Sequence, residues 1–346
     1  MKSKSLVLSL ILTLIIAMIS STGALAHPGR TDSNGGHYCR TNCAKWGLKD
    51  GEYHYHNGGS SSSPSKEKQE PEKDSTSSAA SLLLLPKKQA SGTLQVYYLD
   101  VGQGDSTLIR TPKNQYILID AGNNNQGKNV VKYLNHLGVN TLDAVVATHP
   151  DADHIGGLDD VIKSINVKSV YAPKVSHTTD TYKDFLLAIK NKGLTIKQAK
   201  KDVTIPLNGG ITAKFLAPVN GYGGDLNEWS AVLKVQYKNN SFLFAGDAEI
   251  KSETDMLKNK ALLKADVLKV GHHGSSTSSS KKFIDAVKPK YAIISVGKNS
   301  YGHPNAGILS RLKNVGANVM RTDQKGTITA ISNGSTITFT TTKGAK

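Results

Sequence analysis

From residue 93 onward, short apolar runs alternate with segments of helical periodicity, which predicts two groups of strands with helices between them. Strands are expected at 94–101, 107–110, 115–120, 142–148 and 169–172, then at 211–216, 231–237, 241–245, 326–332 and 336–341, and helices at 129–137, 158–165 and 182–191. Strands in two successive blocks with interspersed helices are typical of two sheets packed face to face with helices outside. The expected fold is therefore a mixed α/β sandwich of four layers.

The first 26 residues have the pattern of a secretory signal peptide. Lys2 and Lys4 precede an apolar run at 6–19, and small residues lead to Ala24-Leu25-Ala26. The run is too short to cross about 30 Å of hydrocarbon, and the small residues fit a cleavage site. We expect a secreted protein that begins near His27 and keeps no membrane span. An uncleaved anchor is the alternative.

Two further boundaries follow from composition. Residues 27–57 are polar and dense in Gly, His and Tyr, which predicts a small domain. Residues 58–92 are rich in Ser, Pro, Lys and Glu, and they offer too little apolar surface to fold, as expected of a flexible linker. The chain is thus expected to comprise a signal peptide (1–26), a small domain (27–57), a linker (58–92) and a large domain (93–346).

The net charge of the chain indicates which kind of molecule it binds. The chain carries 43 Lys and Arg against 27 Asp and Glu, a formal net charge of +16, and residues 93–346 alone carry 32 against 20, or +12. Two cysteines exclude a disulfide scaffold. A large domain with this excess is suited to a polyanion such as nucleic acid or a cell-wall polymer.

The densest chemistry lies at 148–157, Thr-His-Pro-Asp-Ala-Asp-His-Ile-Gly-Gly, directly after an apolar strand. His149, Asp151, Asp153 and His154 fall within six residues. Several carboxylates held close together repel one another unless a cation offsets them. The segment therefore predicts a metal site.

Further metal-binding residue types recur beside other apolar strands. Asp120 and Asp247 follow strands, Asn227 precedes one, and His272 and His273 follow another. Each one alone is weak evidence, because an isolated Gly-Asp is usually a turn. Their joint occurrence strengthens the prediction of a metal centre at an edge of the sheets.

These residues resemble the metallo-β-lactamase fold, an αββα sandwich with a binuclear metal site at its edge. The segments at 99–106, 148–157, 227–230, 272–275 and 301–304 are similar to the extracellular domain of the ComEC family of DNA-uptake proteins. The resemblance covers about residues 93–346 and implies a nuclease that acts on incoming DNA. The membrane channel of that family is missing from this sequence.

The resemblance also implies roles for single residues. It places His149 and Asp151 on one ion, Asp153, His154 and His273 on the other, and Asp247 between them, with His272 reaching the substrate; which of His272 and His273 binds metal stays open. Asp151 and Asn227 stand where many members of the wider superfamily have histidine. More oxygen donors shift the preference from Zn²⁺ toward Mn²⁺ or Mg²⁺. Two divalent ions, Zn²⁺ or Mn²⁺, are expected, and a mononuclear enzyme is the alternative.

In such a site a metal-activated water attacks phosphorus. Asp153 or Asp247 would orient the water, and His272 or His303 would protonate the leaving oxygen. His303 is alternatively a helix-entry residue before Pro304. Gly102, Gly104 and Gly274 would let backbone N–H groups approach phosphate.

The small domain holds a Cys/His cluster that resembles the "YHYH" domain of secreted bacterial proteins. His37, Cys39, Cys43, His54 and His56 offer ligands for one structural Zn²⁺. A disulfide between Cys39 and Cys43 is the equal alternative, since the expected location is oxidising.

The sequence thus predicts a secreted metal-dependent hydrolase, a phosphodiesterase or nuclease acting on extracellular DNA, with the cell wall as an expected site of association. A phosphocholine esterase or lactonase on the same fold is one alternative. A nucleic-acid-binding or wall-binding protein with a degenerate metal site is the other.

Overall fold

The computed structural model describes residues 36–38, 53–55 and 92–343, and the chain divides into two compact units, Met1–Pro71 and Glu72–Lys346. In the first unit, β1 (Gly36–Tyr38) and β2 (Tyr53–Tyr55) pair antiparallel, with His37 opposite His54. Cys39, Cys43 and His56 lie outside the described residues, as does the expected signal peptide. Zinc and disulfide both stay predictions for this unit. Within the described part of the chain, no helix is long and apolar enough to cross a membrane.

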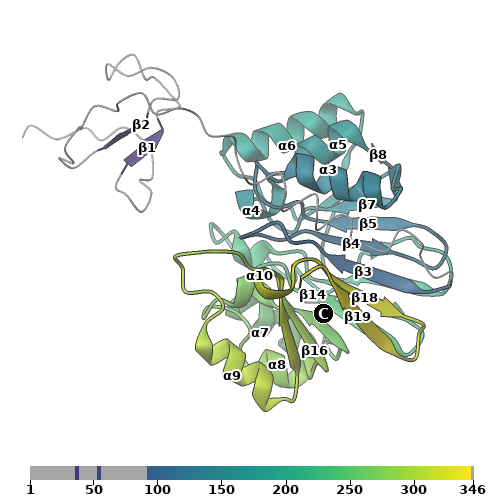
Figure 1. Ribbon diagram of the computed structural model, residues 1–346. Helices are drawn as coiled ribbons and strands as arrows, with labels where there is room; N and C mark the ends of the chain where they lie inside the picture. Colours follow the sequence, from purple (N-terminus) through teal and green to yellow (C-terminus); the bar gives the residue numbers. More distant parts are fainter. Residues whose placement is uncertain (1–35, 39–52, 56–91, 344–346) are drawn as a thin grey trace, which may run out of the picture. The chain divides into compact units, whose positions relative to one another are not determined.

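The second unit contains two large sheets (Figure 1). The order in the eight-stranded sheet is β10 (Ile196–Gln198), β9 (Val170–Ala172), β7 (Ala144–Val146), β5 (Tyr116–Ile119), β4 (Thr107–Arg110), β3 (Leu94–Tyr98), β18 (Ile328–Ser332) and β19 (Ile337–Thr341). The order in the seven-stranded sheet is β11 (Thr204–Ile205), β12 (Ile211–Phe215), β13 (Leu233–Tyr237), β14 (Asn240–Phe244), β15 (Val267–Lys269), β16 (Tyr291–Ile294) and β17 (Asn318–Arg321). A short pair, β6 (Thr141–Leu142) and β8 (Asn166–Val167), lies apart from both.

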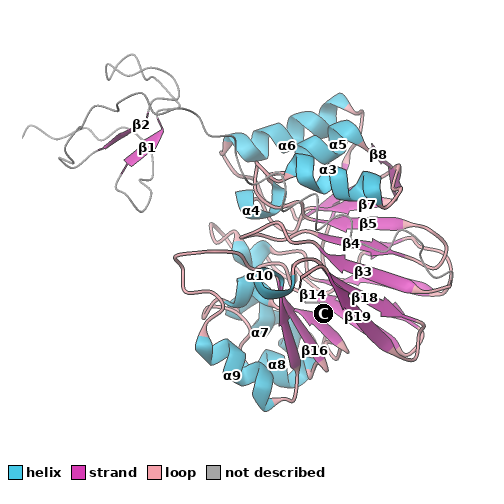
Figure 2. Cartoon of the chain, in the orientation of Figure 1, coloured by secondary structure: helices cyan, strands magenta, loops and turns pink. Residues whose placement is uncertain are grey.

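Helices cover the outer faces of the two sheets (Figure 2). The first sheet is covered by α3 (Gly127–His136), α5 (Leu158–Ser164) and α6 (Asp180–Asn191), and the second by α7 (Ile250–Lys258), α8 (Lys281–Val287) and α9 (Ala306–Asn314). Short helical turns occur at α4 (Ala152–Ile155), α10 (Thr322–Lys325), η2 (Asn227–Trp229) and η3 (Gly271–Gly274). The described unit is therefore the expected four-layer αββα sandwich.

The layers explain why the strands are apolar along their whole length. Along β3, Val96 and Tyr98 pack between the sheets, whereas Tyr97 faces the helices, and all three are fully buried. Successive side chains of a strand point to opposite faces, and here both faces are covered. Continuous apolar runs are the consequence.

The order of the strands along the chain does not show which strands belong to the same sheet. The sequence predicts two successive blocks, but the last hairpin returns to the first sheet, where β18 pairs antiparallel with β3 and Ile328 lies opposite Tyr98. In Figure 1 the yellow C-terminal strands accordingly lie beside the blue β3. This pairing joins residues about 230 positions apart, beyond the reach of any local pattern.

A buried carboxylate holds the segment between η3 and α8. Glu253 on α7 is almost fully buried and accepts the backbone N–H groups of Ser279 (2.5 Å) and Ser280 (2.9 Å). Burial, with a smaller contribution from the Glu228 carboxylate, raises the pKa of Glu253 from 4.5 to about 7. The neutral form is therefore favoured in the folded protein.

This raised pKa predicts a loss of stability with rising pH. The contribution of Glu253 is fully present below pH 4.5 and is lost as the pH rises through about 7, by at most on the order of 3 kcal/mol. We expect the free energy of unfolding of the wild type to fall relative to that of Glu253→Gln across this range, as measured by urea titration. A difference between the two proteins that stays constant with pH would contradict the prediction.

Candidate metal centre

The predicted ligands come from loops at the carboxyl ends of strands. His149 to His154 follow β7 and enter α4, Asp247 follows β14, and His273 lies in η3 directly after β15. Strand β7 runs parallel to β5 in the first sheet, and β14 runs parallel to β15 in the second. Because parallel strands end at the same edge of a sheet, each sheet brings its own loops together at one edge.

Four of these side chains form one cluster. Ligand atoms of Asp153, His154, Asp247 and His273 all lie within 4.8 Å of one another. His154 Nε2 is 3.2 Å from Asp247 Oδ1 and 3.9 Å from Asp153 Oδ2, while His273 Nε2 is 3.1 Å from Asp153 Oδ2 and 3.5 Å from Asp247 Oδ2. Tetrahedral ligands of a zinc-sized ion lie about 3.4 Å apart. The spacing therefore fits a single divalent ion.

The hydrogen-bond inventory supports this fit. His154 Nε2 and Asp247 Oδ1 are buried and lack a hydrogen-bond partner of good geometry in the described structure, and the same holds for His149 Nε2. Buried polar atoms without partners are rare in proteins because each one costs free energy. These three atoms face the cluster or its edge, where a cation would satisfy them.

Each imidazole of the cluster is oriented by a bond at its other nitrogen. His154 Nδ1 lies 2.8 Å from Asp120 Oδ2, and the Asp120 carboxylate also accepts the N–H (2.8 Å) and the hydroxyl (2.6 Å) of Thr148. His273 Nδ1 donates to the carbonyl oxygen of Ser295 at 2.9 Å. Such bonds leave Nε2 free for a metal and strengthen its basicity.

The charges in the cluster are strongly coupled. Burial lowers the pKa of His273, but the carboxylates of Asp247, Asp105 and Asp153 outweigh this and raise it to about 10. Burial likewise lowers the pKa of His154, and Asp247 and Asp153 outweigh it to raise that pKa well above its usual range. The two imidazoles therefore offset the carboxylates, and a divalent ion would take over this role by displacing their protons.

The residues expected to bind the other ion do not form a comparable cluster. His149 Nε2 lies 3.5 Å from Asp151 Oδ2, but neither residue belongs to a group of three or more His, Cys, Asp or Glu ligands among the described residues. Asn227 begins η2 and donates its side-chain N–H to Glu249 Oε1 at 3.3 Å. The structure thus places Asn227 with Glu249.

His272 and His273 have different surroundings although they are adjacent. His273 is buried in the cluster, whereas His272 is partly exposed, with Nδ1 2.9 Å from Glu249 Oε1 and Nε2 3.7 Å from Asp247 Oδ2. The φ angle is positive in both residues, 47° in His272 and 51° in His273. The backbone therefore turns tightly here, and the two adjacent side chains reach different surroundings. The geometry places His273 among the ligands and His272 at the rim.

His303 completes the rim. Its ring centroid lies 5.4 Å from that of His272 and 6.5 Å from that of His273. Burial, with the neighbouring His272 and His273, lowers the pKa of His303. A lowered pKa favours the neutral imidazole at neutral pH, so His303 is better suited to accept a proton than to donate one.

Residues 99–298 match the family model described as the metallo-beta-lactamase superfamily. The chain belongs to this superfamily.

The relatives include a protein that is named as a competence protein. The chain is 33% identical over 252 residues to ComE operon protein 3 of Bacillus subtilis, which is 68% of this chain and 32% of that protein. It is 33% identical over 246 residues to competence protein ComA of Neisseria gonorrhoeae, 70% of this chain and 32% of that protein. The chain thus spans about a third of the length of these relatives.

A solved structure of similar fold is Igni18, a metallo hydrolase from Ignicoccus hospitalis, with a TM-score of 0.47 and 15% identity over 68% of this chain and 98% of that one. The superfamily membership and the four-ligand cluster together support a metal-dependent hydrolase that uses divalent ions.

Two contacts of this metallo-β-lactamase fold centre are not evident from the motifs. Lys269, at the end of β15, is fully buried and forms an ion pair with Asp105, whose other oxygen lies 3.4 Å from His273 Nδ1. Glu249 holds His272, as described above. A lysine inside the apolar run 267–270 is the available sequence signal, because a buried lysine requires a partner.

Proposed function

We propose that the chain is a secreted phosphodiesterase that cleaves nucleic acid, with extracellular DNA as its substrate. The observation that carries the proposal is the four-ligand cluster, with the His272–Glu249 pair at its rim, in a domain of net charge +12. A polyanion is attracted to such a domain, and its phosphodiester offers a leaving oxygen to a rim imidazole. The competence proteins among the relatives support DNA rather than another phosphodiester.

Two ions would be held by the ligands named above. Asp153, His154, Asp247 and His273 would hold one, and His149 with Asp151 would hold the other, with Asp247 shared. When bound, such ions act as Lewis acids toward a phosphoryl oxygen and lower the pKa of water. Zn²⁺ and Mn²⁺ both suit a set of imidazoles and carboxylates.

The remaining chemistry belongs to the chain itself. Burial opposes ionisation of Glu249, but hydrogen bonds from His272, Thr277 and Asn227 outweigh it and lower the pKa of that carboxyl. The ionised Glu249 accepts from His272 Nδ1 and orients the ring, so that Nε2 is the nitrogen left to exchange a proton with the leaving oxygen. Asp153 is the more exposed of the two carboxylates of the cluster, so it is the one that a substrate can reach from solvent.

The apolar cavity next to His149 offers no room for a lactone or an acyl chain. The apolar cavity next to His149, lined among others by Ile155, Tyr182 and Phe185, holds only about 10 Å³, roughly the space of one water. An acyl chain or lactone ring requires an apolar pocket of several hundred Å³. A degenerate binding protein is disfavoured because all four ligands of the cluster are present.

The test is hydrolysis under metal control. We expect the purified chain to bind about two divalent ions and to hydrolyse bis-p-nitrophenyl phosphate and labelled single-stranded DNA. Chelation should abolish both activities, and Mn²⁺ or Zn²⁺ should restore them. Protein that binds the ions but cleaves only phosphocholine or lactone substrates would contradict the proposal.

A further inference from the structure

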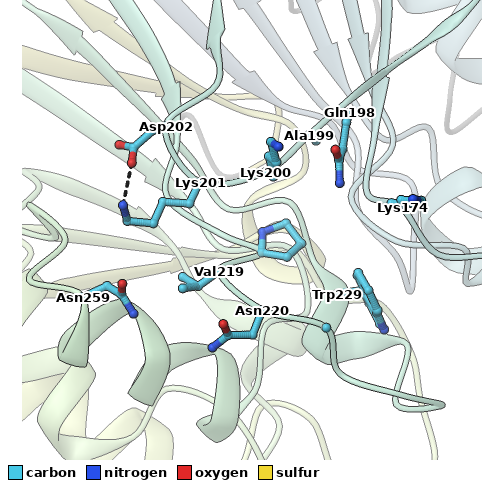
Figure 3. Close-up of a pocket in the computed structure, with 12 residues that line it drawn as sticks. Lys174, Gln198, Ala199, Lys200, Lys201, Asp202, Val219, Asn220, Trp229 and Asn259 are labelled. Carbon is cyan, nitrogen blue, oxygen red and sulfur yellow. Dashed lines mark hydrogen bonds and ion pairs between the residues drawn. The ribbon is translucent and has the colours of Figure 1, made fainter.

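The second unit contains a basic cavity that the chemistry above does not use. It has a volume of about 570 Å³, and its walls include Lys174, Lys200, Lys201, Asn220 and Trp229 (Figure 3). Figure 3 shows Lys174 and Trp229 on one side and the paired Lys201 and Asp202 on the other. Specific ligand sites have volumes of about 300–1,000 Å³, so a nucleotide unit fits.

A second cavity continues the first. Its volume is about 340 Å³, and it shares Lys201, Asp202 and Asn259 with the first cavity. Its own walls add Lys214, Lys234 and Lys260. We call the two cavities together the lysine groove.

The charge of the lysine groove is unbalanced. Among the described residues that line it, six are lysines and Asp202 is the only one with a carboxylate. Asp202 pairs with Lys201 (2.5 Å) and Lys214 (2.6 Å), while Lys174, Lys200 and Lys260 form no ion pair with any described residue. A row of unpaired lysines along a groove attracts a chain of phosphates rather than a single anion.

Short chain segments connect the groove to the metal centre. Trp229 is followed by Ser230, whose hydroxyl accepts the backbone N–H of Asp247 at 3.0 Å, and by Ala231, which donates to the carbonyl oxygen of Thr148 at 2.9 Å. On the same side of the cavity as Trp229, Lys174 lies between Pro173 and Val175, which line the small cavity with His149. The chain neighbours of Trp229 and Lys174 therefore link this side of the groove to the loops that carry the ligands.

Trp229 has the features of a stacking platform. Its ring meets that of Tyr222 edge-on, at 5.9 Å and 88°, and its Nε1–H donates to the carbonyl oxygen of Gly223 at 3.0 Å. These contacts hold the indole in place while it lines the groove and stays partly exposed. An aromatic ring held in this way binds an unpaired base at little entropic cost.

We infer that the lysine groove binds one single strand of nucleic acid, with a base stacked on Trp229 and the backbone phosphates along Lys174 and Lys200. The inference rests on the proposed function, because the strand in the groove is the one whose phosphodiester reaches the centre. A duplex keeps its bases stacked on one another and cannot use Trp229 in this way. A cell-wall polymer has no bases, so it would bind through the lysines alone and would not use Trp229.

The experiment measures binding separately from cleavage. A fluorescent oligothymidylate of about twelve nucleotides is titrated with the full chain in chelator, at about 50 and 200 mM salt. Hydrolysis of bis-p-nitrophenyl phosphate, which is too small to extend along the groove, is measured in the metal-loaded protein. The variants are Trp229→Leu, Trp229→Phe and Lys174→Ala/Lys200→Ala. Lys132→Ala/Lys313→Ala is the control with the same loss of charge, since both lysines are exposed, unpaired and outside the groove.

We expect Trp229→Leu to weaken binding about 5- to 100-fold and Trp229→Phe to retain most of it. Lys174→Ala/Lys200→Ala should reduce the slope of log affinity against log salt by about 1.4, and the control pair should change it far less. All variants should keep wild-type turnover of the small substrate.

Two results would overturn the inference. One is a Lys174→Ala/Lys200→Ala protein that matches the control pair. The other is a Trp229→Leu protein that binds the oligonucleotide as the wild type does. That result would show that no base stacks on Trp229, and it would favour a base-free polymer such as poly(glycerol phosphate) as the occupant of the groove. Failure of the proposed function would be recognised differently, as a wild type that hydrolyses neither substrate whatever its affinity for the oligonucleotide.

Discussion

Asp247→Ala is expected to abolish hydrolysis, with kcat/KM lowered at least about 10³-fold. Asp247 is the carboxylate that lies within 3.7 Å of three imidazoles, those of His154, His272 and His273. Removing it takes one ligand from the cluster. It also takes away the carboxylate that contributes most to raising the pKa of His154 and His273. A catalytic divalent ion supplies several kcal/mol of transition-state stabilisation, which is lost when the ion is lost.

The measurement combines metal content with turnover. Asp247→Ala should retain less metal than the wild type after dialysis and should show no chelator-sensitive hydrolysis of bis-p-nitrophenyl phosphate. Asp285→Ala is the matched control, because its carboxylate is exposed on α8 and pairs with Lys281 at 2.6 Å. Chelator-sensitive turnover at the wild-type rate in Asp247→Ala would show that the centre lies elsewhere.

Lys269→Met is expected to destabilise the folded protein by about 3–5 kcal/mol. The side chain of Lys269 is fully buried, and its ammonium forms an ion pair with Asp105 and donates to the carbonyl oxygen of Val270 at 2.9 Å. Methionine fills a similar volume but carries no charge. Asp105, itself buried, would lose its nearest cation, and an unpaired buried carboxylate is costly.

A second substitution separates charge from packing. Asp105→Asn combined with Lys269→Met removes both charges, and we expect it to recover most of the lost stability, because a buried pair can often be replaced by neutral groups at little cost. Urea titration of the wild type, both single variants and the double variant gives the coupling energy. A Lys269→Met protein within about 1 kcal/mol of the wild type would refute the argument.

Much of the architecture is legible in the sequence because burial leaves a local pattern. The runs at 94–101, 107–110 and 115–120 are apolar along their length because the strands they form are covered on both faces, and each contains a strand of the structure. Helices α3, α5 and α6 follow from their 3.6-residue periodicity. These features depend on neighbours only a few residues away.

The metal motif is legible for a similar reason. His149, Asp151, Asp153 and His154 are close in sequence, so a loop and one turn of helix keep them close in space. Asp247 and His273 are distant, and the sequence places them only through their position after apolar strands and through family resemblance. Their convergence with Asp153 depends on the two sheets being packed face to face.

The choice between His272 and His273 required the tertiary structure. Two adjacent histidines look the same in sequence, and both have positive φ. Their surroundings differ because the carbonyl oxygen of Ser295 orients His273 into the cluster, while the carboxylate of Glu249 holds His272 at the rim. Neither partner is adjacent in sequence, since Ser295 and Glu249 lie 22 and 23 residues away.

The sequence by itself therefore determined many of the strands, the helices α3, α5 and α6, the excess of positive charge and the motif that follows β7. The tertiary structure alone decided the return of β18 to β3, the burial of Lys269 against Asp105 and the lysine groove. The first set reflects the period of a helix or strand, which sterics impose on adjacent residues. The second set joins residues from different elements, and those contacts form only where packing of the two sheets brings the strand ends and their loops together.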